Sequence, residues 1–177
     1  MKQKVILVNR DDKVIGEMEK IEAHQKALLH RAVSVFIFDT KGHMLLQKRA
    51  MCKYHSPGLW TNTACTHPQP NESYEKAATR RLSEEMGITN TALTKLFDFV
   101  YKEELDQGLT EHELDHVFIG ISDAAPKVEP TEVSDYRYVA PKELLTHIQA
   151  SPQAYTVWFK QIINRVIEEY STLQKKR

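Results

Sequence analysis

GLWTNTACTHP, residues Gly58–Pro68, is the stretch on which the interpretation of this 177-residue chain depends. It follows a Ser-Pro-Gly turn, and we expect it to run as an extended, Thr-rich segment until Pro68 ends it. Because side chains alternate along an extended chain, Cys65 and His67 should point to the same side, about 7 Å apart. The sequence therefore predicts a pocket that a thiol and an imidazole share.

A Cys-x-His pair is weak evidence for a site when it stands alone, because most cysteines are inert core residues and many histidines lie at the surface. Other parts of the chain add candidates: Glu111 and Glu113 form a second i, i+2 pair, and His24 and His30 lie upstream. Three histidines and two carboxylates suit a borderline divalent metal with mixed N and O ligands. On a regular helix His24 and His30 would lie about 240° apart, so they converge only if the backbone between them is irregular.

The composition is typical of an ordinary globular protein, with 41% hydrophobic residues and 24 basic against 24 acidic groups. We expect one domain over residues 1–177. Zero net charge argues against a general nucleic-acid or membrane-surface binder, so an anion site requires a local basic cluster. Met1–Val8 is too short an apolar run for a signal peptide, and no stretch reaches the length of a membrane span. Cys52 and Cys65 are therefore expected as free thiols in a reducing cytoplasm.

The hydrophobic pattern predicts a sheet with later helices. Ala32–Phe38 is nearly all apolar, which indicates a central strand. Alternation in the strand Glu111–Ile121 puts Glu111, Glu113 and Asp115 on the same face as two core residues, so one end of that face is acidic. The other expected strands are Val5–Val8, Val14–Glu19, Met44–Arg49, Leu93–Tyr101 and Asp135–Val139, with a charged loop at Lys102–Thr110 and helices from Pro141 and over Thr156–Leu173.

A further helix is predicted over Glu72–Gly87, where Gly87 is the expected C-cap. Its apolar stripe comprises Ala77, Ala78, Leu82 and Met86. The charged residues outside the stripe are Glu72, Arg80, Arg81, Glu84 and Glu85. The simplest account of them is an exposed helix face with ion pairs worth a few tenths of a kcal/mol each.

The spacing of these residues resembles the Nudix box, which places a metal-binding helix against a pyrophosphate. Two positions differ, because Thr66 stands where the first glycine of the box should be and Arg81 replaces the glutamate that follows Arg80. Losing that glutamate removes a carboxylate from the Mg²⁺ cluster with which hydrolases activate water. Arg81 would instead attract a phosphate oxygen, which favours holding a diphosphate over cleaving it.

Leu29–Ala32 (LHRA), Gly58–Pro68, the altered box and Glu111–Glu113 (EHE) occur in this order, and together they closely resemble the type I isopentenyl-diphosphate Δ-isomerases. The likeness runs from Val5 to the helix of Trp158. It implies an α/β (α+β) fold of Nudix type, a mixed central sheet flanked by helices. It also implies a prenyl diphosphate substrate, isopentenyl or dimethylallyl diphosphate. We expect a monomer or weak homodimer with no nucleic-acid or membrane partner.

The resemblance assigns roles to individual residues. The ligands of one divalent metal, Zn²⁺, Mn²⁺ or Mg²⁺, would be His24, His30, His67, Glu111 and Glu113. A second ion, Mg²⁺, would join Glu85 and the Cys65 carbonyl to the diphosphate. The diphosphate-binding cations would be Lys20, Arg49, Lys53 and Arg81. The gap from His24 to His30 is one residue shorter than in enterobacterial members, so the loop between them should differ.

The chemistry of the implied reaction explains why these residue types are needed. The double bond moves when C4 of an unactivated alkene gains a proton and C2 loses one. We assign protonation to Glu113 with Tyr101, and proton removal to Cys65 on the opposite face of the substrate. Trp158 would stabilise the tertiary carbocation by about 2 kcal/mol. A lid from the N-terminal segment or the last helix would exclude water.

Two alternatives make different predictions. A Nudix pyrophosphohydrolase would release phosphate with Mg²⁺, whereas an isomerase releases none. A closed structural zinc site of Cys65, His67, His24 and His30 would leave the two glutamates unexplained, since such sites favour Cys and His alone.

Overall fold

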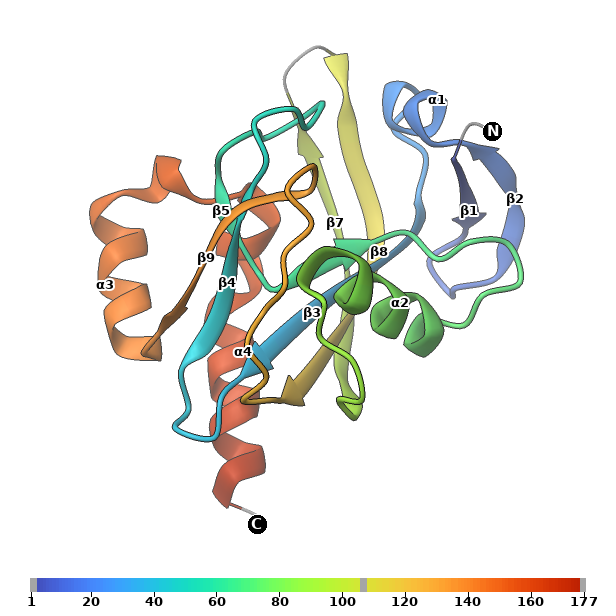
Figure 1. Cartoon of the computed structure of the whole chain (residues 1–177). Coiled ribbons are helices and arrows are strands. Elements are labelled where there is room, and N and C mark those ends of the chain that lie inside the picture. The colour runs from blue at the N-terminus through green and yellow to red at the C-terminus, as the bar shows by residue number, and fades with distance from the viewer. Residues whose placement is uncertain (1–2, 106–107, 176–177) are drawn as a thin grey trace.

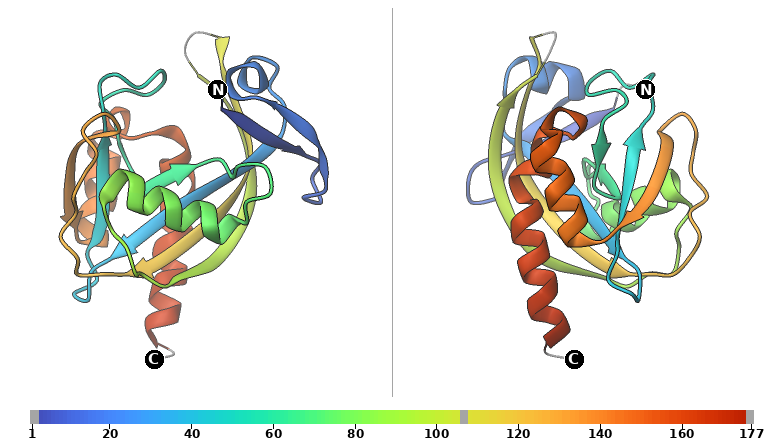
Figure 2. Two further views of the ribbon diagram at one scale, coloured as in Figure 1. Left: turned by 45° about the vertical axis from the view of Figure 1, so that its right-hand side comes forward. Right: turned by 90° about the vertical axis from the view of Figure 1, so that its left-hand side faces the viewer.

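The computed structural model describes residues 3–105 and 108–175, in which nine strands form one mixed sheet between helices (Figures 1 and 2). The strands are β1 (Lys4–Val8), β2 (Val14–Glu19), β3 (His30–Phe38), β4 (Met44–Arg49), β5 (Trp60–Thr61), β6 (Ala64–Thr66), β7 (Leu93–Glu104), β8 (Thr110–Ile121) and β9 (Val133–Val139). The helices are α1 (Lys20–Gln25), α2 (Tyr74–Met86), α3 (Pro141–Ala150), the 3-10 turn η2 (Pro152–Ala154) and α4 (Val157–Lys175). The α/β class and the mixed sheet flanked by helices are confirmed.

The sheet divides at β3. This strand pairs in parallel with β8 over its whole length, from His30↔Glu113 to Phe38↔Ile121. It pairs with β4 only at its end, through Ile37 and Phe38, whereas β4 continues beside β9. The β3–β8 and β4–β9 pairs therefore diverge from one common end. Gly58–Pro68 lies in the opening, with β6 paired to β3 and β5 paired to β4.

One buried side chain, Thr63, joins the diverging strands where the backbone ladder stops, and its neighbour Asn62 bonds β3. The Thr63 hydroxyl accepts a bond from Ile37 N–H (2.9 Å) and donates one to the Leu45 carbonyl (2.7 Å). Asn62 Nδ2 donates to the Val35 carbonyl at 3.2 Å. Residues 62 and 63 thus interrupt the segment between β5 and β6, and the prediction of one continuous extended run is wrong at this point. Side-chain bonds take the place of ladder bonds because buried backbone groups need partners.

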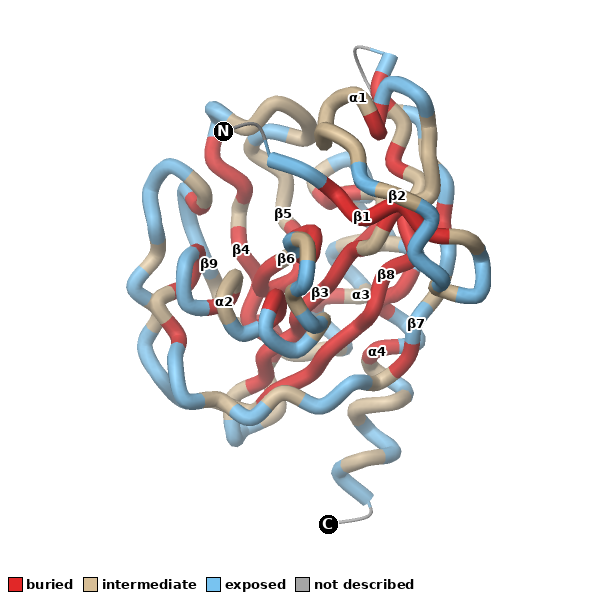
Figure 3. Tube along the Cα trace, turned by 90° about the vertical axis from the view of Figure 1, so that its right-hand side faces the viewer, coloured by how far each residue is buried: buried red, intermediate tan, exposed pale blue. Residues whose placement is uncertain are grey.

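Both faces of the sheet are covered around β3, which is a central strand, as its apolar run predicted. Figure 3 shows β3 and β8 buried along most of their length. Val33, Val35 and Ile37 belong to the core under α2, while Phe36 and Phe38 belong to the core under α4. This alternation explains why β3 has apolar residues on both sides. No helix among the described residues is both long and apolar enough to cross a bilayer.

Several predicted boundaries need correction. Helix α2 begins at Tyr74 instead of Glu72, because the Ser73 hydroxyl caps it by accepting from Lys76 N–H. Its C-cap is Gly87, as predicted, with φ +63°. Strand β7 continues to Glu104 because it pairs with β8 as far as Thr110, so the loop predicted at Lys102–Thr110 is shorter. Strand β9 begins at Val133, two residues before the predicted start.

The bridge at Thr63 can be tested by unfolding in urea. Thr63→Val keeps the shape of the side chain but leaves the Ile37 N–H and the Leu45 carbonyl unpaired, so the free energy of unfolding should fall by about 2 kcal/mol or more. Thr63→Ser keeps the hydroxyl and loses one methyl group, which costs about 1 kcal/mol. A serine variant as unstable as the valine variant would contradict the bridging role.

Candidate active site

A cavity of about 310 Å³ opens where the strands diverge. The predicted site residues that line it are Lys20, Arg49, Lys53, Cys65, His67, Arg81, Glu85, Tyr101, Glu111, Glu113 and Trp158. They come from α1, β4, the segment around β6, α2, β7, β8 and α4. The divergence of the sheet therefore gathers side chains from distant parts of the sequence around one space.

Four of the predicted metal ligands meet beside this cavity. Ligand atoms of His24, His30, His67 and Glu113 all lie within 4.8 Å of one another, and all four residues are buried. His30 and Glu113 are neighbours in the parallel β3–β8 register. His24 joins them because α1 ends at Gln25 and the chain then reverses, bringing the two histidine rings to 4.8 Å. The irregular backbone that their spacing required is therefore present.

The histidine ring orientations fit metal binding. His24 Nδ1 bonds the Lys20 carbonyl (2.7 Å) and His30 Nδ1 bonds the Leu28 carbonyl (2.8 Å). Since a carbonyl only accepts, both Nδ1 atoms carry the proton and both Nε2 lone pairs are free. These buried Nε2 atoms make no hydrogen bond among the described residues, although His30 Nε2 lies 3.5 Å from Glu113 Oε1. Backbone-anchored rings with free lone pairs are typical of metal sites, and the cluster could hold a divalent metal.

Burial keeps the imidazoles of His24 and His67 in the form that binds metal. It lowers the pKa of His67 to about 3 and also lowers the pKa of His24. Neutral imidazole is the ligand form, so protons do not compete with a metal for these two residues at neutral pH.

Tyr101 connects the two predicted glutamates. Its hydroxyl donates to Glu113 Oε2 at 2.6 Å, and the same hydroxyl oxygen lies 3.0 Å from Glu111 Oε2. Burial, followed by the charge of Glu113, raises the pKa of Glu111 well above its usual value. Burial alone would also raise the pKa of Glu113, but the hydrogen bond with His67 and the nearby His30 ring hold it well below its usual value. Glu111, the fifth predicted ligand, is not among the four clustered residues; its Oε1 lies 3.6 Å from His55 Nε2.

Cys65 faces the same cavity as Glu113 and lies outside the metal cluster. Burial raises the pKa of its thiol to about 12, so it is protonated at neutral pH. Asn62 Oδ1 lies 3.7 Å from Cys65 Sγ and accepts a bond from Trp158 Nε1 at 3.3 Å. Asn62 therefore positions both the thiol and the indole. The described residues do not form the closed Cys/His zinc site that was considered as an alternative.

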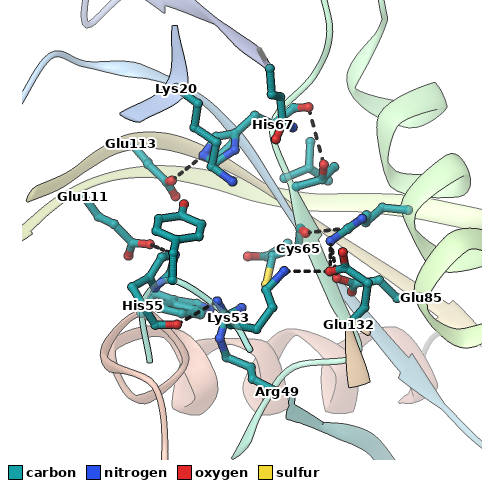
Figure 4. Close-up of a pocket in the computed structure, with 18 of the residues that line it drawn as sticks. Lys20, Arg49, Lys53, His55, Cys65, His67, Glu85, Glu111, Glu113 and Glu132 are labelled. Atoms are coloured by element: carbon teal, nitrogen blue, oxygen red, sulfur yellow. Dashed lines mark hydrogen bonds and ion pairs between the residues drawn. The ribbon is translucent and has the colours of Figure 1, made fainter. Parts of the chain in front are cut away.

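The part of the site around Lys53 and Glu132 carries both positive and negative side chains (Figure 4). Lys53 Nζ donates to Glu132 Oε2 at 2.6 Å, and Arg81 Nη2 donates to the same oxygen at 2.5 Å. Arg81 also contacts Glu85 Oε1 at 2.6 Å and donates to the Cys65 carbonyl. Glu85 is only 3% exposed and accepts from Gln47 Nε2 at 2.7 Å. The simple interpretation of Glu85 as part of an exposed, ion-paired face is therefore wrong.

The other two predicted cations complete a basic region. Lys20 Nζ lies 4.8 Å from the centroid of the Tyr54 ring. Burial, followed by the charge of Lys53, lowers the pKa of Lys20 to about 8. Arg49 donates to the carbonyls of His55 and Ser56, so it also holds the loop that covers this end. Together these groups form a region that attracts a compact polyanion.

Sequence reasoning did not predict several side chains at the site: Gln47, Tyr54, His55, Asn62 and Glu132. Asn62 lies inside the quoted stretch, and its place between Trp60 and Cys65 could have indicated a role. Tyr54 and His55 directly follow Lys53, a predicted diphosphate-binding residue, and this position could have indicated that they lie at the site. Glu132 gives no local signal, because it meets Lys53 across 79 residues of chain.

Comparisons with known proteins agree with this geometry. Residues 28–159 match the NUDIX domain family. The "Isopentenyl-diphosphate Delta-isomerase 2" of Photorhabdus laumondii is 49% identical over 98% of this chain and 99% of its own. The "Isopentenyl-diphosphate Delta-isomerase" of Pectobacterium atrosepticum is 45% identical over 98% of this chain and 96% of its own.

Solved structures show the same fold at low identity. DR0079 from Deinococcus radiodurans has a TM-score of 0.77 and 22% identity, covering 92% of this chain and 98% of its own. A MutT NUDIX hydrolase from Burkholderia pseudomallei has a TM-score of 0.63 and 22% identity, covering 78% of this chain and 98% of its own. The near full-length relatives are much more similar in sequence, and they decide the family. This chain belongs to the NUDIX domain family and, within it, to the isopentenyl-diphosphate Delta-isomerases.

Proposed function

We propose that this chain interconverts isopentenyl and dimethylallyl diphosphate. The observation that supports this most strongly is that Cys65 and Glu113 line one cavity together with the cations Lys20, Arg49, Lys53 and Arg81. Two proton-handling groups and a basic region suit an alkene with a diphosphate tail. The names of the relatives in Photorhabdus and Pectobacterium point to the same reaction.

The donor set favours Zn²⁺, Mn²⁺ or Mg²⁺ at His24, His30, His67 and Glu113, with Glu111 as the further predicted ligand. A bound divalent ion would supply Lewis acidity that makes a neighbouring proton donor stronger. Glu85 and the Cys65 carbonyl would hold Mg²⁺ together with the diphosphate. Arg81, which now bonds both groups, would then turn toward the phosphate oxygens.

Protons move at two carbons of the substrate. In the direction from isopentenyl diphosphate, the Glu113–Tyr101 pair adds a proton at C4 and Cys65 removes one from C2, so that the substrate keeps its number of protons. This direction starts with the proton on the Glu113–Tyr101 pair and with Cys65 as a thiolate, whereas the thiol of the free site is protonated, which is the starting state of the reverse direction. In the reverse direction the thiol and the carboxylate exchange roles. The indole of Trp158, held by Asn62, lies beside the cavity, where it stabilises the tertiary cation between these steps.

Hydrolysis is less well supported than isomerisation. Arg81 occupies the box position at which hydrolases carry a further carboxylate, and in this chain it is paired with Glu85 and Glu132. We propose that the activity resides in one domain of residues 1–177, acting in the cytoplasm as a monomer or weak homodimer. Its partner would be the prenyl diphosphate alone, without nucleic acid or membrane.

The direct test follows isopentenyl diphosphate by proton NMR. The metal-loaded protein should form dimethylallyl diphosphate without releasing phosphate, and chelation should stop the reaction. Cys65→Ala should lower kcat at least about 100-fold while leaving metal content unchanged, because the thiol lies outside the metal cluster. Cys52→Ala, at an exposed thiol, is the control and should retain activity. Phosphate release without an allylic product would refute the proposal.

The ionisation of Lys20 predicts a pH dependence of substrate affinity. Its pKa is lowered to about 8, so the free enzyme loses this positive charge as pH rises through 8. KM for isopentenyl diphosphate should be nearly flat up to about pH 7, roughly double by pH 8, and then rise by up to about tenfold per pH unit. Lys20→Arg keeps its charge and should flatten the profile. An equally steep profile in the arginine variant would exclude Lys20 as the cause.

A further inference from the structure

Glu132 is a carboxylate in the basic region that neither the family resemblance nor the sequence pattern assigns to the site. It lines the cavity, and its side chain is 26% exposed. A single oxygen, Oε2, accepts from the ammonium of Lys53 (2.6 Å) and the guanidinium of Arg81 (2.5 Å). An oxygen held by one ammonium and one guanidinium has the surroundings expected of a phosphate oxygen.

The backbone of Glu132 is fixed, while its side chain is not enclosed. Its carbonyl accepts from Ala50 N–H (3.0 Å) and its own N–H donates to the Glu129 carbonyl (2.9 Å). The next residue, Val133, pairs with Arg49 at the start of β9. The carboxylate therefore reaches the cations from a rigid strand end, and rotation of its side chain can withdraw it without moving the backbone.

The four cations are not equally available to a ligand. Arg49 is engaged by loop carbonyls, and Lys20 lies over the Tyr54 ring. Lys53 and Arg81 share the Glu132 carboxylate, and Arg81 is also held by Glu85. A diphosphate that binds Lys53 and Arg81 has to compete with the charge of Glu132.

We propose that Glu132 is a built-in counter-ion which occupies Lys53 and Arg81 until the diphosphate arrives, and which thereby limits affinity for the anionic tail and speeds its release. This rests on the proposed function, since it takes the diphosphate as the ligand of these cations. The carboxylate keeps two partly buried cations paired in the free enzyme, so it stabilises the fold while it weakens binding. A residue that only supports the site would stabilise the fold without weakening diphosphate binding, so the two effects together distinguish a counter-ion from such a residue.

The test measures calorimetric binding of inorganic diphosphate, with excess Mg²⁺, to the metal-loaded enzyme. Glu132→Gln keeps the shape but removes the competing charge, so diphosphate should bind about fivefold tighter or more. KM for isopentenyl diphosphate should fall as well. The melting temperature without ligand should drop, and it should recover by more than in the parent when diphosphate is added. Glu129→Gln is the control, because it removes an equal charge from an exposed carboxylate that bonds Thr131. This variant should change neither the affinity for diphosphate nor KM.

A second variant tests the competition itself. Lys53→Met should weaken diphosphate binding in both backgrounds, and by more when Glu132 is already glutamine, because Lys53 is then fully available to the ligand.

Unchanged or weaker binding in Glu132→Gln would overturn the proposal and would indicate that Glu132 supports the anion site or its Mg²⁺. If Glu132→Gln binds diphosphate more tightly than the parent but the parent does not isomerise isopentenyl diphosphate, the proposed function fails while the counter-ion role stands. If the parent isomerises and Glu132→Gln binds no tighter, only the counter-ion role fails.

Discussion

The structure depends on satisfying the backbone where β3 and β4 part. Two strands that diverge inside a core expose N–H and C=O groups that water cannot reach, and each unpaired group costs about 1–3 kcal/mol. The Thr63 hydroxyl, as both acceptor and donor, joins Ile37 to Leu45 across the opening. This buried bridge allows the sheet to split, and the split creates the cavity.

The same local geometry positions the reactive groups. Asn62, next to Thr63, bonds the backbone of β3 and also contacts the Cys65 thiol and the Trp158 indole. The parallel register of β3 and β8 sets His30 beside Glu113. Cys65, Trp158 and Glu113 all line one cavity. The sheet and the Asn62 side chain hold these groups in place, which suits chemistry that needs two groups at fixed positions around a small substrate.

Local patterns predicted much of this arrangement. The apolar run of β3 indicated a central strand, and the alternation in β8 indicated a face with an acidic end. The i, i+2 spacings placed Cys65 with His67 and Glu111 with Glu113 on common faces, and the structure brings these residues to one cavity. Family resemblance supplied the assignment of roles, which spacing alone could not give.

The remaining features depend on contacts between distant segments. The interruption at Asn62–Thr63 arises because β3 and β4 separate, which is a property of the whole sheet. Glu85 looked like one charge among several on a polar helix face, yet Gln47 and Arg81 bury it. The pairing of Glu132 with Lys53 and Arg81 follows from the docking of β9 beside β4. A pattern of a few neighbouring residues carries no information about contacts between segments that are far apart in the sequence.

The central claim is that two separate groups, on opposite faces of the substrate, exchange protons at C4 and C2. A single turnover of isopentenyl diphosphate in D₂O, read by deuterium NMR, tests it most directly. The account predicts dimethylallyl diphosphate with one deuterium in the methyl group derived from C4, because the donor has exchanged with solvent and the C2 proton leaves to a different group. Product free of deuterium would show one group carrying the same proton from C2 to C4, and would contradict the account.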